Sequence, residues 1–98
     1  MGRVRRTKPK RLGEKLLQVR IALNLSQNEM LERLGLSDKL FRSAVSGYEL
    51  GKREPPLPVL LEFARLANVY VDALIDDELD LPSRLPSRSK NAGVKRRI

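Results

Sequence analysis

The side chains best suited to binding a polyanion lie mainly at the two ends of the chain. Residues 1–11 contain six lysines and arginines, residues 82–98 contain six more, and neither segment contains an acid. The remaining 8 basic residues and all 12 acidic residues lie between them, so residues 12–81 carry a net charge of −4 (8 − 12). Basic tails around a mildly acidic body favour a nucleic acid partner. They are also typical of segments that provide only solubility and disorder.

The chain has neither histidine nor cysteine. This excludes disulfides, zinc-finger ligand sets and every catalytic pair of a nucleophile with a histidine. Only serine–lysine or carboxylate chemistry would remain, and no pocket-forming motif supports either. We therefore predict a protein that is not an enzyme and that needs no metal or other cofactor.

No apolar run approaches the roughly 18 residues that span a bilayer. The basic start, Met1 to Arg6, is not followed by the apolar stretch of a secretory signal. We expect a cytoplasmic protein with no membrane partner.

The spacing of apolar residues predicts an all-α domain with short connections. Leu12, Leu16, Val19 and Leu23 form one helical stripe, and Ser26 with Glu29 has the pattern of a capping box. The expected helices are Leu12–Leu23, Ser26–Leu34, Arg42–Leu50, Leu57–Ala67 and Val71–Ile75. The expected stop positions are Asn24, Gly35, Gly51 and Asn68.

Composition divides the chain into three parts. Residues 1–11 are interpreted as a flexible basic arm, residues 12–81 as the folded domain, and residues 82–98 as a disordered basic tail. The acidic stretch Asp76–Asp80 leaves three alternatives: it folds back on a basic tail, caps the bundle, or contacts another protein.

Several separated motifs resemble one known family. They are Leu12-Gly13-Glu14-Lys15, Leu23-Asn24-Leu25-Ser26-Gln27, Leu34-Gly35-Leu36-Ser37 and the run from Val45 to Pro55. Their order is similar to that of the Xre family of Cro- and lambda-repressor-like helix-turn-helix proteins, over about residues 12–76. The resemblance implies a compact five-helix, lambda-repressor-like DNA-binding domain whose third helix enters the major groove.

The resemblance also implies which residues of that third helix contact DNA. The candidates are the residues at its front and on its outward face: Arg42, Ser43, Ala44, Ser46 and Gly47. Arg42 is the leading base reader, because its fork can bond guanine O6 and N7 together. A phosphate contact is the alternative for Arg42. Gly47 stands where the family often has a longer side chain, which indicates either a close backbone approach or fewer base contacts.

Other candidates would contact phosphates. Gln27 and its neighbour Asn28 start the second helix, where free amides favour an anion. Lys52 and Arg53 follow the third helix and would position the protein without reading bases. Lys39 lies before the third helix, and the arm contributes Arg3, Arg5 and Arg6. The alternatives are an ordinary helix start for Gln27 and a solvated basic pair for Lys52 and Arg53.

Two further expectations follow from the family pattern. It implies a structural ion pair between Arg20 and Glu49, with no role as a site. Gly35 and Glu49 are 14 positions apart, about four more than the family's spacing implies. The excess falls in Ser37–Phe41. It forms either an extra helical turn or, as we expect, a longer turn with Leu40 or Phe41 against the core.

We therefore expect a sequence-specific, double-stranded-DNA-binding regulator of transcription, acting as a repressor, with a homodimer as one expected state. The alternative is an antitoxin or adaptor whose tail, residues 77–98, binds a partner protein.

Overall fold

A computed structural model describes residues 8–36 and 43–86. These two ranges form five helices and no strand: α1 (Leu12–Ala22), α2 (Gln27–Arg33), α3 (Ala44–Glu49), α4 (Leu57–Ala67) and α5 (Val71–Ile75). The predicted all-α, five-helix architecture is confirmed. None of these helices is long and apolar enough to cross a membrane, within the part of the chain that is described.

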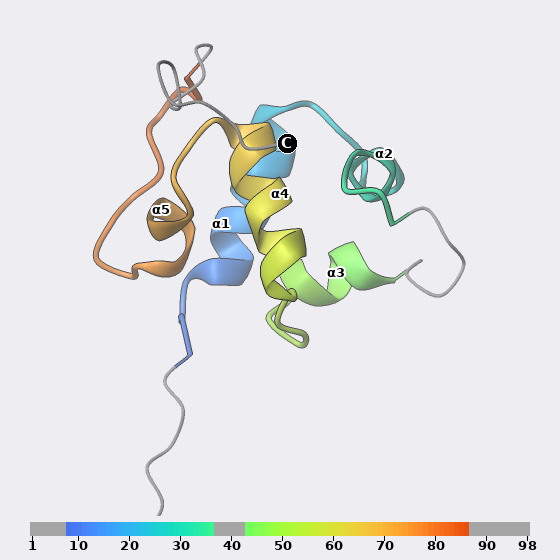
Figure 1. Cartoon of the computed structure of the whole chain (residues 1–98), viewed down its shortest axis with the longest axis horizontal. Coiled ribbons are helices and arrows are strands. Elements are labelled where there is room, and N and C mark those ends of the chain that lie inside the picture. Colours follow the sequence, from blue (N-terminus) through green and yellow to red (C-terminus); the bar gives the residue numbers. More distant parts are fainter. Residues whose placement is uncertain (1–7, 37–42, 87–98) are drawn as a thin grey trace, which may run out of the picture.

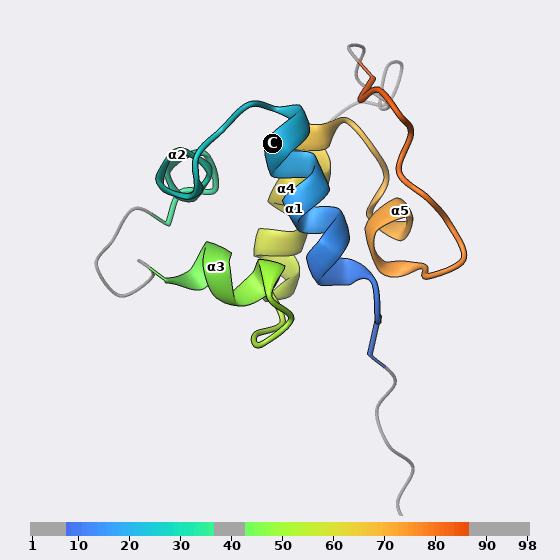
Figure 2. The ribbon, with the colours of Figure 1, turned by 180° about the vertical axis from the view of Figure 1, so that it is seen from behind.

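The helices surround a central pair. α1 and α4 lie side by side in the middle, α2 and α3 lie on one side of them, and α5 lies on the other (Figures 1 and 2). α1 contacts α3, α4 and α5, so it connects both sides of the domain. The position of α3 therefore depends directly on α1.

The helix ends follow the residues that the sequence singled out. The Ser26 hydroxyl accepts from the Glu29 amide at 3.0 Å, and the Glu29 carboxylate accepts from the Ser26 amide at 2.8 Å, which completes the capping box. These hydrogen bonds hold the pKa of Glu29 below its usual value. The four expected stop residues all adopt positive φ: Asn24, Asn68, Gly35 and Gly51.

The third helix is shorter than expected. We predicted a helix from Arg42, but α3 begins at Ala44 and Ser43 lies in the turn before it. The Ser43 side chain makes no capping hydrogen bond. Arg42 and the predicted long turn, including Leu40 and Phe41, lie outside the described residues.

The core is aliphatic, as the composition predicts. Leu12, Leu16 and Val19 of the expected stripe are buried, while Leu23 is only partly buried. Tyr48 of α3 meets Phe63 of α4 edge to face, with ring centroids 6.5 Å apart. This contact attaches α3 to the central pair.

Gly13 lets α1 and α3 approach each other closely. A Cβ atom at position 13 would lie 2.8 Å from the carbonyl oxygens of both Tyr48 and Glu49. Those oxygens belong to the backbone of α3 and cannot turn aside as a side chain can. Any larger residue would have to push the two helices apart.

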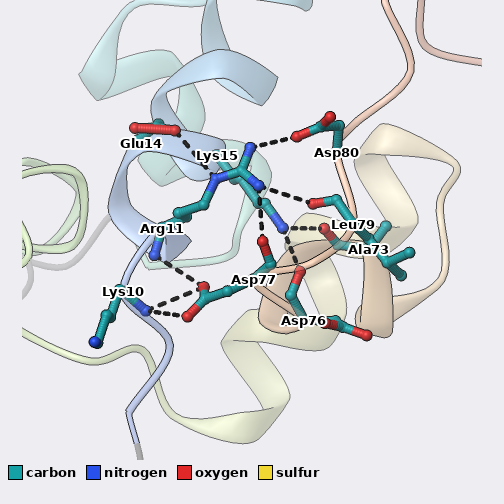
Figure 3. Close-up of polar contacts among 9 residues, drawn as sticks. All are labelled: Lys10, Arg11, Glu14, Lys15, Ala73, Asp76, Asp77, Leu79 and Asp80. Atoms are coloured by element: carbon teal, nitrogen blue, oxygen red, sulfur yellow. Dashed lines mark hydrogen bonds and ion pairs between the residues drawn. The ribbon is translucent and has the colours of Figure 1, made fainter.

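Lys15 was not anticipated as a core residue. Its side chain is completely buried, and its ammonium donates to the backbone carbonyls of Ala73 at 2.9 Å and Asp76 at 2.7 Å (Figure 3). These carbonyls lie at the C-terminal end of α5, where a cation is favourable. Lys15 thus fixes α5 to α1.

The acidic stretch folds back on the end of the N-terminal basic segment, the first of the three alternatives considered for it. The Asp77 carboxylate accepts from the backbone amides of Lys10 and Arg11, at the entry to α1 (Figure 3). The Arg11 side chain donates to the Asp77 carbonyl at 2.8 Å and pairs with Asp80 at 2.5 Å. Lys10 and Arg11 are therefore held against the loop that follows α5, and we propose that the domain starts before residue 12.

The chain after residue 81 also packs against the helices. Leu81 is buried, Leu85 packs against the core, and the Asn68 side-chain amide donates to the Pro86 carbonyl at 3.0 Å. The chain therefore packs against the helices as far as residue 86, and we propose that the domain extends beyond residue 81.

Replacing Gly13 with Ala should destabilise the domain by about 1–3 kcal/mol, the typical cost of overpacking. The methyl group would meet backbone oxygens of α3, which outweighs the better helix propensity of alanine. Urea unfolding measures the change. Gln18→Ala, at an exposed position of the same helix, should change stability by less than about 0.5 kcal/mol. Equal stability of the Gly13→Ala variant and the parent chain would contradict the close packing.

Candidate nucleic-acid interface

α3 has one face in the core and one face toward solvent. Val45 and Tyr48 are buried, whereas Ser43 is exposed and Ser46 is half-buried. The two serines expected to contact DNA therefore lie on the side of the segment away from the core. The face is small, because α3 has only 6 residues.

Ala44 does not share this outward face. It was expected to face DNA, but its side chain is completely buried in the hydrophobic core. The reason is helical periodicity: Ala44 lies four positions before the buried Tyr48 and next to Val45, so it belongs to the inward face of α3. Ala44 is therefore removed from the candidate DNA contacts.

Gly47 is covered by Arg53. A Cβ atom at position 47 would lie 2.8 Å from Cδ and 3.2 Å from Cγ of the Arg53 side chain. The space expected to serve a close backbone approach is thus occupied by the stem of an arginine. Because Gly47 has no side chain, the stem of Arg53 can lie directly against the helix at this position.

The backbone of the following turn holds Arg53 in this place. The amides of Lys52 and Arg53 both donate to the Gly47 carbonyl, at 2.9 and 3.1 Å. Gly51, with φ of +74°, reverses the chain just before them. Both basic side chains are exposed, and they extend from the turn that follows α3.

A two-point ion pair joins α1 to the end of α3. Arg20 donates from Nε to Glu49 Oε2 at 2.6 Å and from Nη2 to Glu49 Oε1 at 3.1 Å. Its Nη1 also donates to the Leu25 carbonyl at 2.9 Å. The hydrogen bonds to Glu49 raise the pKa of Arg20. The expected ion pair is present, and it also contacts the turn between α1 and α2.

The same carboxylate binds Gln27. The Gln27 side-chain amide donates to Glu49 Oε1 at 3.0 Å, so the start of α2 is tied to the end of α3. Gln27 was expected to donate to a phosphate. In the structure its side-chain amide binds Glu49, and the Gln27 side chain remains exposed. Asn28, beside it, is exposed as well.

No motif indicated that the entry to α1 lies beside the turn after α3, where both line one groove. A groove of about 160 Å³ is bordered on one side by Lys8, Pro9 and Lys10, and on the other by Gly51 to Glu54. Gly13 and Tyr48 form part of its floor. The remaining candidates, Arg3, Arg5, Arg6, Lys39 and Arg42, lie outside the described residues.

Removing one partner of the Arg20–Glu49 pair should destabilise the domain by about 2–4 kcal/mol, because the other charge stays largely buried without its partner. The side chain of Glu49 is only 5% exposed. Chemical unfolding of Arg20→Met, Glu49→Met and the double variant measures the coupling. The double variant should be clearly more stable than the sum of the single changes predicts. Strict additivity would show that the pair contributes nothing.

Comparison with known proteins places this arrangement in a family. The helix-turn-helix family matches residues 16–74. Among solved structures, the restriction-modification controller protein C.AhdI from Aeromonas hydrophila is 33% identical with a TM-score of 0.55, covering 65% of this chain and 91% of its own. The P22 c2 repressor, solved with a synthetic operator, is 24% identical with a TM-score of 0.59 over 67% of this chain and 94% of its own; this likeness concerns the fold.

Two relatives from Bacillus subtilis carry the name of uncharacterized HTH-type transcriptional regulators. YobD is 34% identical over 63% of this chain and 52% of its own length, and YqaE is 34% identical over 67% and 53%. The chain spans about half the length of these relatives. The match across residues 16–74, on a five-helix fold with α2 and α3 tied through Glu49, agrees with the predicted resemblance: the chain belongs to the helix-turn-helix family, as a Cro- and lambda-repressor-like domain of the Xre type.

Proposed function

We propose that the chain binds specific sequences in double-stranded DNA and represses transcription. The observation that carries this proposal is the division of α3 and its flanks into two faces. Val45 and Tyr48 hold the element in the core, while Ser43, Ser46 and the Arg53 side chain lie on the other side. A major groove about 12 Å wide admits one helix of this kind.

The proposed DNA contacts are of two chemical kinds, with base edges and with the phosphate backbone. Ser43 and Ser46 are short hydrogen-bonding side chains that suit base edges or nearby phosphates. Lys52 and Arg53 extend from the turn and suit the phosphate backbone. Gln27 and Asn28, at the other end of the motif, would contact a second stretch of backbone. Arg42 stays a proposed base reader.

Repression is proposed because binding alone can block promoter DNA. The names of the relatives support a role in transcription: two are HTH-type transcriptional regulators, and one structural relative is a restriction-modification controller protein. A two-fold dimer would present two α3 helices to half-sites one DNA turn apart, roughly 34–36 Å. Sedimentation equilibrium with and without DNA tests the dimer.

The alternative, an antitoxin or adaptor that uses residues 77–98, is less favoured. Asp77, Asp80 and Leu81 are already engaged with the chain's own domain, through the entry to α1 and the core. A pull-down that requires residues 77–98 would support this alternative.

Selection from random duplex DNA at two salt concentrations tests the proposed function. The parent chain should enrich a defined sequence. Lys52→Ala should weaken binding to all sequences alike and reduce the salt slope by about 1, as expected for a phosphate contact. Ser46→Ala should relax the preference at one position with little change in salt slope. Failure to bind any duplex at low salt would contradict the proposal.

Gly47→Ala should separate DNA binding from stability. Alanine is the better helix former by up to about 1 kcal/mol, so the stability of the domain should not fall. The new methyl group would displace the Arg53 stem, and DNA affinity should therefore drop. Thermal unfolding and a binding titration on the same sample measure both effects. In the Arg53→Ala background the substitution should no longer weaken binding. If Gly47→Ala weakened DNA binding equally in the Arg53→Ala background, its effect would not depend on Arg53.

A further inference from the structure

Two acidic side chains hold the segment that leads into α1. The Asp77 carboxylate accepts from the Lys10 amide at 2.9 and 3.1 Å and from the Arg11 amide at 3.0 Å. The Arg11 guanidinium in turn donates to the Asp77 carbonyl and to Asp80 (Figure 3). Backbone and side chain of the same segment are thus bound by one loop that follows α5.

This contact fixes the chain where it enters α1. Arg11, at the N-cap position of α1, makes no capping side-chain hydrogen bond. Asp77, 66 positions after Arg11 in the chain, accepts from the amides of Arg11 and of Lys10, the residue before the helix. A carboxylate at this end is also favoured by the helix dipole. The path of the chain before Leu12 is therefore set by a distant residue.

The held segment lies beside the proposed DNA surface. Lys8 and Lys10 border the same groove as Lys52 and Arg53, and Glu54 adds one carboxylate to its rim. Four basic residues and one acid thus surround a groove next to the end of α3. This distribution suits one stretch of sugar-phosphate backbone more than a cation or a neutral ligand.

Two acids of the loop, Asp77 and Asp80, are compensated by nearby cations and amides, whereas Asp76 and Glu78 border a neighbouring pocket beside Lys8. Asp80 pairs with Arg11, and the buried ammonium of Lys15 lies close enough to act on both Asp77 and Asp80. The amides of Lys10 and Arg11 lower the pKa of Asp77, so its carboxylate is ionised at neutral pH. The negative charge of Asp77 faces the backbone amides of Lys10 and Arg11 at the entry to α1, and these amides compensate it.

We propose that Asp77 is a positioning residue for DNA binding: by holding the Lys10 and Arg11 amides, it keeps Lys8 and Lys10 beside Lys52 and Arg53, so that all four contact one stretch of DNA backbone. The proposal rests on the DNA-binding function argued above. It adds Lys8 and Lys10 to the proposed phosphate contacts. It also gives the loop that contains Asp77 a role in DNA binding, because Asp77 orders the backbone that carries these two lysines.

A binding cycle tests this role. The probe is a fluorescein-labelled duplex of mixed sequence, about 20 base pairs long, titrated at two salt concentrations with the full chain. Lys8→Ala/Lys10→Ala should bind more weakly at low salt and reduce the salt slope by about two. Asp77→Ala should weaken binding about tenfold, the equivalent of ordering roughly one residue of backbone on binding. Combined with the lysine changes, Asp77→Ala should have no further effect.

Controls separate positioning from charge and from folding. Glu62→Ala removes one negative charge from an exposed ion pair on α4 and should leave binding close to that of the parent chain. Asp77→Asn retains an acceptor oxygen and should lose less affinity than Asp77→Ala. Asp77→Asn also serves as the test variant if the alanine variant does not fold.

Hydrogen exchange without DNA gives an independent readout. The Lys10 and Arg11 amides should exchange faster in Asp77→Ala than in the parent chain, while amides in the middle of α4 should not change. Unchanged exchange, unchanged affinity, or an equal loss of affinity with and without Lys8 and Lys10 would overturn the positioning role. If the parent chain binds no duplex, the proposed function fails, and this inference fails with it.

Discussion

The orientation of α3 depends on its contact with α1. At one point Gly13 leaves room for the carbonyl oxygens of Tyr48 and Glu49, and a side chain there would separate the helices. At another, Arg20 of α1 binds the Glu49 carboxylate with two nitrogens. A close backbone approach and a two-point ion pair restrain both the distance and the rotation of a helix too short to be stable alone. Because these contacts fix the inward face of α3, the opposite face of the helix is directed at solvent.

Local patterns predicted most of the fold. The capping box at Ser26, the left-handed Asn24 and Asn68, and the apolar stripe of α1 each depend on neighbours a few residues away. Such neighbours can be recognised without knowing the fold. The pairing of Arg20 with Glu49 is a long-range contact, and only the family resemblance indicated it.

Two of the unpredicted features, at Lys15 and Asp77, join distant parts of the chain, and two, at Gly47 and Ala44, are local. Lysine is normally a surface residue. The burial of Lys15 is explained only by its hydrogen bonds to the carbonyls at the end of α5. The stem of Arg53 fills the space over Gly47 because the turn reverses at Gly51. Asp77 reaches amides 66 and 67 positions earlier. Ala44 was misplaced for a local reason: it lies four positions before Tyr48 and therefore on the same inward face of α3.

The central claim is that DNA meets the molecule on the outer side of α3 and the turn that follows it. Amide chemical shifts recorded while a duplex is titrated into the labelled chain measure this directly. The account predicts that the largest changes fall at Ser43, Ser46, Gly47, Lys52 and Arg53, with little change at Tyr70 and Ile75 on the far side. Changes centred on α5, with α3 unaffected, would contradict it.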